Sequence, residues 1–228
     1  KVDSPDNHFS QVVVALAKKG IEVSGQYNQF ANIHVWGCSE QGVHLKTSFL
    51  SFNQAYIDGV QVQIDDPWQV EIINSKFFAH LDDPDWSFIV LKPTKQNTYI
   101  KGLKIKDSSF HNTESTIKGL KIDNSVGSFH PTEIRDCFML DNSFINVAPF
   151  ASRARQALNQ TNVQIWEADF ASLFPFGSIQ SVTYGFQNTA GNFANCQVQS
   201  ITDQKVLIKT DRSVSGTLWV EADINRLD

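Results

Sequence analysis

Long runs of a single chemical character are missing from this sequence of 228 residues. The net charge is −5 and no extended basic segment occurs, which argues against nucleic acid or an anionic membrane as a partner. The longest purely apolar run covers residues 12–17 and is far too short to span a bilayer. No signal peptide opens the chain, which begins at Lys1, so we expect a fragment or a processed product.

Cysteine is also scarce. Cys38, Cys137 and Cys196 stand at unrelated spacings and give neither a disulfide framework nor a zinc motif. The sequence contains no G-x-S-x-G, no P-loop and no Rossmann fingerprint. We therefore expect neither a metal nor an organic cofactor.

Short strands are what the sequence does contain. Long helix-forming stretches are absent, while β-branched residues occur in short bursts among many Asn, Ser, Thr and Gln residues. There are seventeen phenylalanines, and apolar residues make up 41% of the chain, enough for a sizeable core. This composition predicts an all-β protein with many short strands.

Strand-like alternation recurs from about residue 20 to residue 147. In "ANIHVWGC" (31–38), Ile33 and Val35 are expected on one face and His34 and Trp36 on the other. Similar bursts follow at residues 42–45, 59–64, 70–77, 100–110, 117–125, 133–138 and 141–147. Two Gly-Val pairs and two copies of "IKGLKI" are each seventeen residues apart, so we expect some coils of that length.

The ends of several bursts share a second pattern. "NSKF", "DSSF", "DCF" and "DNSF" place Asn or Asp before a small residue and Phe. The pattern predicts a solenoid whose successive coils stack about 4.8 Å apart, with ladders of small polar residues and Phe inside and at the corners. Loops inserted at one corner would give coils of unequal length.

The character of the sequence changes at residue 148. Residues 148–160 resemble a linker with a short helical segment, and the strands beyond it are separated by turn signals such as "TDQK" and "DRSVSG". We predict two parts: a parallel β-helix at residues 1–147, and a linker with a C-terminal β-rich cap or trimerisation module at residues 148–228.

Two acidic turns next to tryptophan carry the main chemical hypothesis. "QIDDPW" (63–68) holds Asp65 and Asp66, and "HLDDPDW" (80–86) holds Asp82 and Asp83. If seventeen residues make one coil, the carboxylates stack about 5 Å apart, or about 9–10 Å across two coils. Retaining and inverting glycosidases need such separations. The alternatives are ordinary Asp-Pro turns and a calcium site.

Further candidates surround these turns. Glu71 is expected to point outward between Val70 and Ile72. The candidate catalytic carboxylates are Asp65, Asp66, Glu71, Asp82 and Asp83. The candidate substrate contacts are Trp36, Trp68, Asp85, Trp86, His34 and His44, of which Trp68 and Trp86 offer apolar ring faces on which sugars can stack. We expect His34 and His44 to project outward from neighbouring strands next to Trp36, where a metal pair without an obvious third ligand is the alternative. A solvated strand face is the alternative for Glu71.

The alternating strands and their endings, together with "NIHVWGCSEQGVHL", resemble right-handed parallel β-helices of the pectin-lyase type. With a separate C-terminal β module, the arrangement resembles the distal part of a bacteriophage tailspike. The resemblance covers about residues 20–147 as a fold pattern and the rest only as architecture. It implies a right-handed parallel β-helix followed by a small antiparallel module. It also implies a homotrimer on the virion tail, outside the cell at the host surface.

The same resemblance implies a function. Many such proteins recognise and hydrolyse a bacterial surface polysaccharide, an O-antigen or capsule, as endoglycosidases. A polysaccharide lyase is less favoured, because Arg135 is the only arginine in the strand region and its partners are not recognisable. The alternative is a non-catalytic adhesin, or a stalk and trimerisation fragment of a viral fibre. The two hypotheses differ in whether the acidic turns line one groove.

Overall fold

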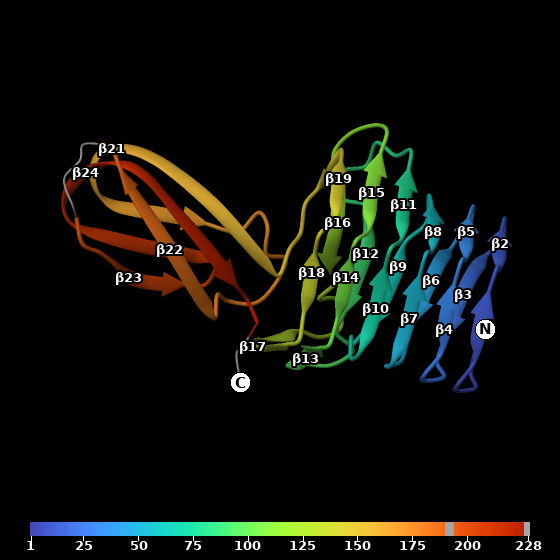
Figure 1. The fold of residues 1–228 in the computed structure, drawn as a ribbon. Coiled ribbons are helices and arrows are strands. Elements are labelled where there is room, and N and C mark those ends of the chain that lie inside the picture. Colours follow the sequence, from blue (N-terminus) through green and yellow to red (C-terminus); the bar gives the residue numbers. More distant parts are fainter. Residues whose placement is uncertain (190–193, 226–228) are drawn as a thin grey trace.

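The computed structural model describes residues 1–189 and 194–225, and over these residues it is all-β. Eighteen of the strands form three parallel sheets of six (Figure 1). Sheet A contains β3 (Lys19–Val23), β6 (Gln41–Leu45), β9 (Val62–Asp65), β12 (Ser87–Lys92), β16 (Ile117–Ile122) and β20 (Val147–Ala148). Sheet B contains β1 (His8–Ser10), β4 (Gln29–Ala31), β7 (Leu50–Asn53), β10 (Val70–Ile73), β14 (Lys104–Lys106) and β18 (Phe138–Leu140).

Sheet C contains β2 (Val13–Ala15), β5 (His34–Trp36), β8 (Tyr56–Asp58), β11 (Lys76–Ala79), β15 (Ser109–Asn112) and β19 (Ser143–Ile145). The chain passes from B to C to A in each coil and then returns to B one strand further along, giving a right-handed parallel β-helix. A short sheet of β13 (Thr98–Lys101) and β17 (Phe129–Arg135) adds to the later coils. The predicted fold class is confirmed.

The expected coil length of seventeen residues is wrong. Corresponding corner residues are 20 apart between Ala55 and Ser75, 33 apart between Ser75 and Ser108, and 34 apart between Ser108 and Asn142. Each coil needs three strands and three turns, and the later coils also carry insertions. The two "IKGLKI" copies lie on different faces: the first spans β13 and β14, and the second forms β16.

The corner between sheets B and C explains the repeated Asn or Asp. One residue per coil has a left-handed backbone there, with φ from 50° to 57°: Gln11, Asn32, Gln54, Asn74, Asp107 and Asp141. Asn and Asp tolerate this conformation better than most L-residues. The small residue that follows closes a ladder, because Ser75 N donates to Ser108 Oγ (3.1 Å) and Ser108 N donates to Asn142 Oδ1 (3.0 Å).

The phenylalanine of the pattern points inward. Phe77, Phe110 and Phe144 stack with ring centroids 4.5 and 5.4 Å apart. The ladder prediction is thus confirmed for "NSKF", "DSSF" and "DNSF". It is wrong for "DCF", because that segment lies at the corner that leads into sheet B, where Cys137 is buried and Phe138 is 38% exposed.

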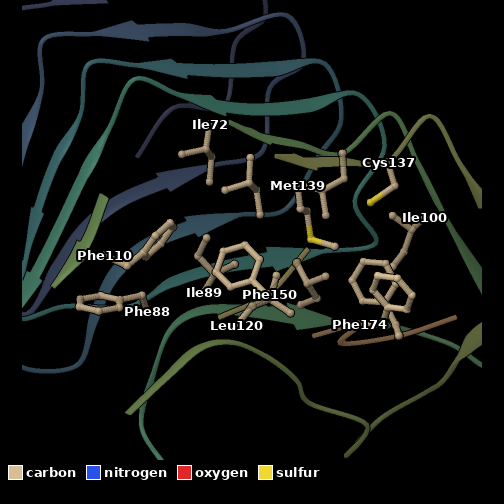
Figure 2. Packing of buried hydrophobic residues seen from close by; sticks show 14 of the residues in the cluster. Ile72, Phe88, Ile89, Ile100, Phe110, Leu120, Cys137, Met139, Phe150 and Phe174 are labelled. Carbon is tan, nitrogen blue, oxygen red and sulfur yellow. The ribbon is translucent and has the colours of Figure 1, made fainter. Parts of the chain in front are cut away.

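The C-terminal part is an antiparallel sheet of β21 (Arg153–Asp169), β22 (Ser181–Asn188), β23 (Cys196–Thr202) and β24 (Lys205–Asp223). The helical segment expected at residues 148–160 is wrong, because Arg153 to Gln160 pair with β24 as strand. Figure 2 shows Phe150 and Phe174 among the inward side chains of the last coils, so this part closes the end of the β-helix core. Residues 190–193 and 226–228 of the predicted cap lie outside the described residues.

Two further observations bear on function. No helix in the described part of the chain is long and apolar enough to cross a membrane. The described residues also include no group of three or more His, Cys, Asp or Glu side chains arranged to hold a metal ion.

Candidate functional site

The outward face of sheet A brings together polar groups from four successive coils. His44 on β6 lies beside Gln63 on β9, and Asp65 on β9 lies beside Lys92 on β12. The next coil adds Asp123, which directly follows β16 and pairs with Lys92 at 3.1 Å. Period-2 alternation places these side chains outside, while Ile64 and Leu91 of the same strands are buried.

Asp65 is the most enclosed carboxylate of this face. Its Oδ2 lies 2.8 Å from His44 Nε2, and its Oδ1 accepts a hydrogen bond of 2.7 Å from Gln63 Nε2. The side chains of His44 and Asp65 are only 12% and 16% exposed. Because a carboxylate only accepts hydrogen bonds, His44 must carry its proton on Nε2 in this contact.

These contacts determine the ionisation of Asp65. Burial by itself raises the pKa of the Asp65 carboxyl, but the hydrogen bonds from His44 and Gln63 outweigh it. The positive charge of Lys92 acts in the same direction. The pKa of Asp65 therefore lies below its ordinary value, and the group is an oriented carboxylate at neutral pH.

Asp123 is a second carboxylate on the same face that the sequence reasoning missed. It lies two strands from Asp65, about 9–10 Å along the sheet, with Lys92 on the strand between them. The hydroxyl and amide of Ser125, together with Lys92, hold the pKa of Asp123 below its usual range. The sequence did contain a signal for Asp123, because Lys92 and Asp123 stand at the ends of their strands in the same position as Asp65 does.

The other members of the two acidic turns make turn contacts. Asp66 has a left-handed backbone with φ of 41° and accepts hydrogen bonds from the amide (2.9 Å) and hydroxyl of Thr94. Asp83 Oδ1 accepts the amide of Asp85 at 3.0 Å. These are the contacts of the ordinary-turn alternative.

The expected stacking of the two acidic turns is wrong. Asp65 ends β9, whereas the loop with Asp82 and Asp83 precedes β12, so the two turns lie at opposite ends of neighbouring strands. The strand register places Lys92 beside Asp65 instead.

Asp85 and Trp86 lie at the other end of sheet A. Asp85 pairs with Lys118 at 2.8 Å, and Lys118 followed by Lys121 lowers the pKa of this exposed carboxyl. Trp86 packs edge-on against buried Phe88 and lines a cleft of about 240 Å³. The cleft is also lined by Cys38, Ser39, Glu40, Gln41, Gly42, Gly59, Val60, Gln61 and Gln63, so it reaches the hydrogen-bond partner of Asp65.

The remaining candidates lie on other faces. Glu71 points outward as expected, but from sheet B, where it pairs with Lys104 at 2.5 Å. His34 and Trp36 point outward from sheet C, and His34 stacks on Tyr56 with ring centroids 4.6 Å apart. His34 and His44 do project outward from consecutive strands, β5 and β6. One turn separates these strands and places them in different sheets, so the expectation that both histidines lie next to Trp36 is wrong.

Trp68 lies between these faces. It follows β9, in the turn that leads from sheet A to sheet B, and it forms an isolated parallel bridge with Lys101. The predicted substrate contacts thus do not form one group. Of the predicted site residues, His44, Asp65, Asp85 and Trp86 border the outward face of sheet A, the last two at its other end.

Taken together, the architecture is that of right-handed parallel β-helices of the pectin-lyase type. No family model matches the chain. Polygalacturonase QRT3 of Arabidopsis thaliana is 25% identical over 224 residues, which cover 94% of this chain and 44% of that protein. The chain therefore spans less than half the length of this curated relative.

A solved structure was also matched over the whole chain. It is the Gp54 tailspike of Acinetobacter baumannii bacteriophage AP22 in complex with A. baumannii capsular saccharide. The match covers 57% of that chain, with 8% sequence identity and a TM-score of 0.42.

Proposed function

We propose that the protein binds a polysaccharide across the outer face of sheet A and hydrolyses a glycosidic bond there. The observation that carries the proposal is the pair of carboxylates Asp65 and Asp123 with Lys92 between them on successive strands. Their backbone separation of about 9–10 Å is close to the upper limit of the ~6.5–9.5 Å found between the carboxyl groups of inverting glycosidases and far from the ~5–5.5 Å of retaining enzymes. We therefore expect inversion at the anomeric carbon.

The surroundings suggest which carboxylate does what. Asp65 is ionised and oriented by His44 and Gln63, as a general base that activates water must be. Asp123 has a side chain 33% exposed and is held ionised mainly by Ser125 and Lys92. A bound sugar that covers Asp123 and draws Lys92 away raises its pKa by desolvation, and the protonated form is the general acid.

The charges of this face favour an acidic polymer. Lys92, Lys118 and Lys121 point outward from β12 and β16. Lys92 and Lys118 pair with Asp123 and Asp85, and we propose that they exchange these partners for the carboxylates of a uronic acid chain. The relative named a polygalacturonase supports the same class of polymer. We accordingly propose a polysaccharide that contains uronic acids as the substrate.

Finer assignments rest on the sequence resemblance. They are a bacterial surface polysaccharide as the natural substrate, a homotrimeric assembly and a place on a phage tail outside the host cell. Each remains a proposal. An acidic capsular polysaccharide is consistent both with the sequence resemblance and with the lysine side chains on the outer face of sheet A.

The test is incubation of the purified protein with polygalacturonate and with a panel of bacterial capsules and O-antigens. We expect new reducing ends without the ultraviolet absorbance of the unsaturated ends that a lyase produces. Asp65→Asn and Asp123→Asn should each lower the rate at least 100-fold, because each removes a proton-transfer group. Asp58→Asn, which changes an outward carboxylate on sheet C, is the matched control and should keep full activity. Cleavage at the wild-type rate by both Asp65→Asn and Asp123→Asn would contradict the assignment of these two carboxylates to the reaction.

A non-catalytic adhesin is the second candidate. It is favoured by the separation of the two acidic turns, which do not line one groove. Binding of a polymer without new reducing ends under all conditions would decide for it.

A further inference from the structure

We propose that sheet B carries a second glycan-binding groove that accepts a stretch of neutral sugars. The groove has a volume of about 340 Å³ and is open to solvent. It crosses the first four coils and is lined by Asp6, His8, Tyr27, Gln29, Phe49, Leu50, Ser51, Gln69 and Glu71. That the ligand is a polysaccharide rests on the proposed function. The location of the site and the class of sugar are inferred from the residues of this groove.

The floor of the groove is a polar row. His8, Gln29 and Ser51 stand opposite one another on β1, β4 and β7, and Glu71 continues the row on β10. Neighbouring members are one strand spacing apart, about 4.8 Å. The row therefore offers hydrogen-bonding groups at regular intervals along the helix axis, as the hydroxyl groups of an extended sugar chain require.

The wall of the groove is aromatic. Tyr27 stacks on Phe49 with ring centroids 4.7 Å apart, and Phe49 lies 5.4 Å from Trp68. Tyr27 is 49% exposed and Trp68 is 38% exposed. Aromatic faces beside a polar row match the two surfaces of a pyranose ring, one of C–H groups and one of hydroxyl groups.

The backbone gives an independent reason to assign a function to this wall. Tyr27 and Phe49 both have φ of 58°, at the corner where Gly102 has φ of 67° in a later coil. Bulky L-residues rarely adopt this conformation, and glycine adopts it freely. The fold needs only the left-handed turn, so large aromatic rings here oppose the local preference. Gln69 and Asp136 have the same left-handed backbone in other coils, so the turn belongs to the fold and only the choice of aromatic residues at this corner needs another reason.

The charged side chains of the groove differ from those on the outer face of sheet A. Among its described lining residues, the ones with an ionisable side chain are Asp6, His8, Tyr27 and Glu71, and none is Lys or Arg. Lys104 reaches the edge but pairs with Glu71 at 2.5 Å. The described lining therefore offers no unpaired cation to the carboxylates of a uronic acid chain, and the groove favours uncharged sugars.

The wall also continues beyond the groove. Trp68 borders a second hollow together with Tyr99, Lys101, Glu133 and Arg135. Tyr99 is 51% exposed there. An extended chain bound in the groove can therefore follow exposed aromatic rings across further coils.

The experiment measures binding of the full chain to neutral polysaccharides, namely galactan, mannan, xylan and xyloglucan, by affinity electrophoresis and titration calorimetry. Polygalacturonate serves as the acidic comparison. We expect the wild type to bind at least one neutral polymer. The double variant Tyr27→Gly with Phe49→Gly should bind it at least tenfold more weakly. Glycine suits the left-handed backbone, so the thermal unfolding midpoint is expected to stay close to that of the wild type.

Three further variants make the result specific. Tyr56→Ala removes a tyrosine of similar exposure from sheet C and should leave binding unchanged. Ser51→Phe fills the floor without touching the wall and should weaken binding like the double variant. Asp65→Asn should abolish hydrolysis but not binding to neutral polymers, so failure of this inference and failure of the proposed function are distinguishable.

Three outcomes overturn the inference. One is a wild type that binds none of the neutral polymers. Another is equal binding by the wild type and by the double and Ser51→Phe variants. The third is a change in oligomeric state of the double variant, measured by light scattering, which would make the groove an interface between copies of the chain.

Discussion

At the scale of single residues, the outer face of sheet A shows how neighbours determine what a carboxylate can do. Asp65 and Asp66 are adjacent in sequence, yet Asp65 is bound by His44 and Gln63 whereas Asp66 closes a turn on Thr94. Alternation along β9 predicts only which side chain points outward. The partners come from coils that are distant in sequence.

The His44 contact makes a prediction about pH. The pKa of Asp65 is lowered in the folded protein, so its interactions add stability above the unfolded value, and this contribution is lost as the pH falls through the folded pKa. His44→Gln removes one of the groups that lowers it. We expect the pKa of Asp65 to rise and the acid limb of the pH–rate profile to move to higher pH.

Carbon-detected NMR titration of the Asp65 carboxyl measures the shift directly, and the pH dependence of kcat/KM measures its effect on activity. His34→Gln is the matched control, because that histidine lies on sheet C. An unchanged Asp65 titration in His44→Gln would show that the hydrogen bond does not set its ionisation.

At the scale of strands and turns, the corner between sheets B and C is the best-determined element. Asn or Asp at a left-handed position and a small residue after it are local requirements, so the pattern is readable in sequence. The seventeen-residue spacing gave a wrong coil length because identical sequence segments occur on different faces. The first "IKGLKI" spans two strands, whereas the second forms a single strand. Periodicity predicts inward and outward side chains, not the sheet to which a strand belongs.

The corner ladder makes a stability prediction. Ser75 is 1% exposed; its Oγ accepts the amide of Ala55 (3.1 Å) and donates to Ile73 O (2.9 Å). Ser75→Ala leaves the buried amide of Ala55 without its partner, which costs roughly 1–3 kcal/mol in the free energy of unfolding, whereas Ile73 O keeps the amide of Gln54 (3.1 Å). Urea unfolding measures it. Ser109→Ala, at an outward position of β15, is the control and should change stability by less than about 0.5 kcal/mol.

At the scale of the whole molecule, the antiparallel sheet and the β-helix share one apolar core. The contact also includes a buried polar link, in which Asn225 Oδ1 accepts the amide of Cys137 (2.7 Å) and Asn225 Nδ2 donates to Cys137 O (2.8 Å). Asp223 in turn accepts hydrogen bonds from Asn225 and pairs with Arg153 at 3.0 Å. The link closes the last coil, whose strand edges would otherwise remain unpaired. The division at residue 147, like the homotrimer, remains a prediction.

This link can be tested by Asn225→Ala, which leaves the amide and carbonyl of Cys137 without partners. We expect the free energy of unfolding to fall by roughly 2–3 kcal/mol and the antiparallel sheet to become more sensitive to proteolysis than the β-helix. Chemical unfolding and limited proteolysis with mass spectrometry check both. Gln187→Ala, at an exposed position of β22, is the comparison. Equal protease sensitivity of Asn225→Ala and the wild type would contradict the role of the link.

By itself, the sequence determined the fold class, the inward and outward faces of most strands, and the corner that needs Asn or Asp, because these depend on neighbours a few residues away. Only the tertiary structure decided which faces meet. It placed Lys92 beside Asp65 and Asp123 one strand further along, put Asp82 and Asp83 at the far end of the neighbouring strand, and assembled the aromatic wall of sheet B. The physical reason is that coils of unequal length set the register between strands, and no local pattern encodes the length of an inserted loop.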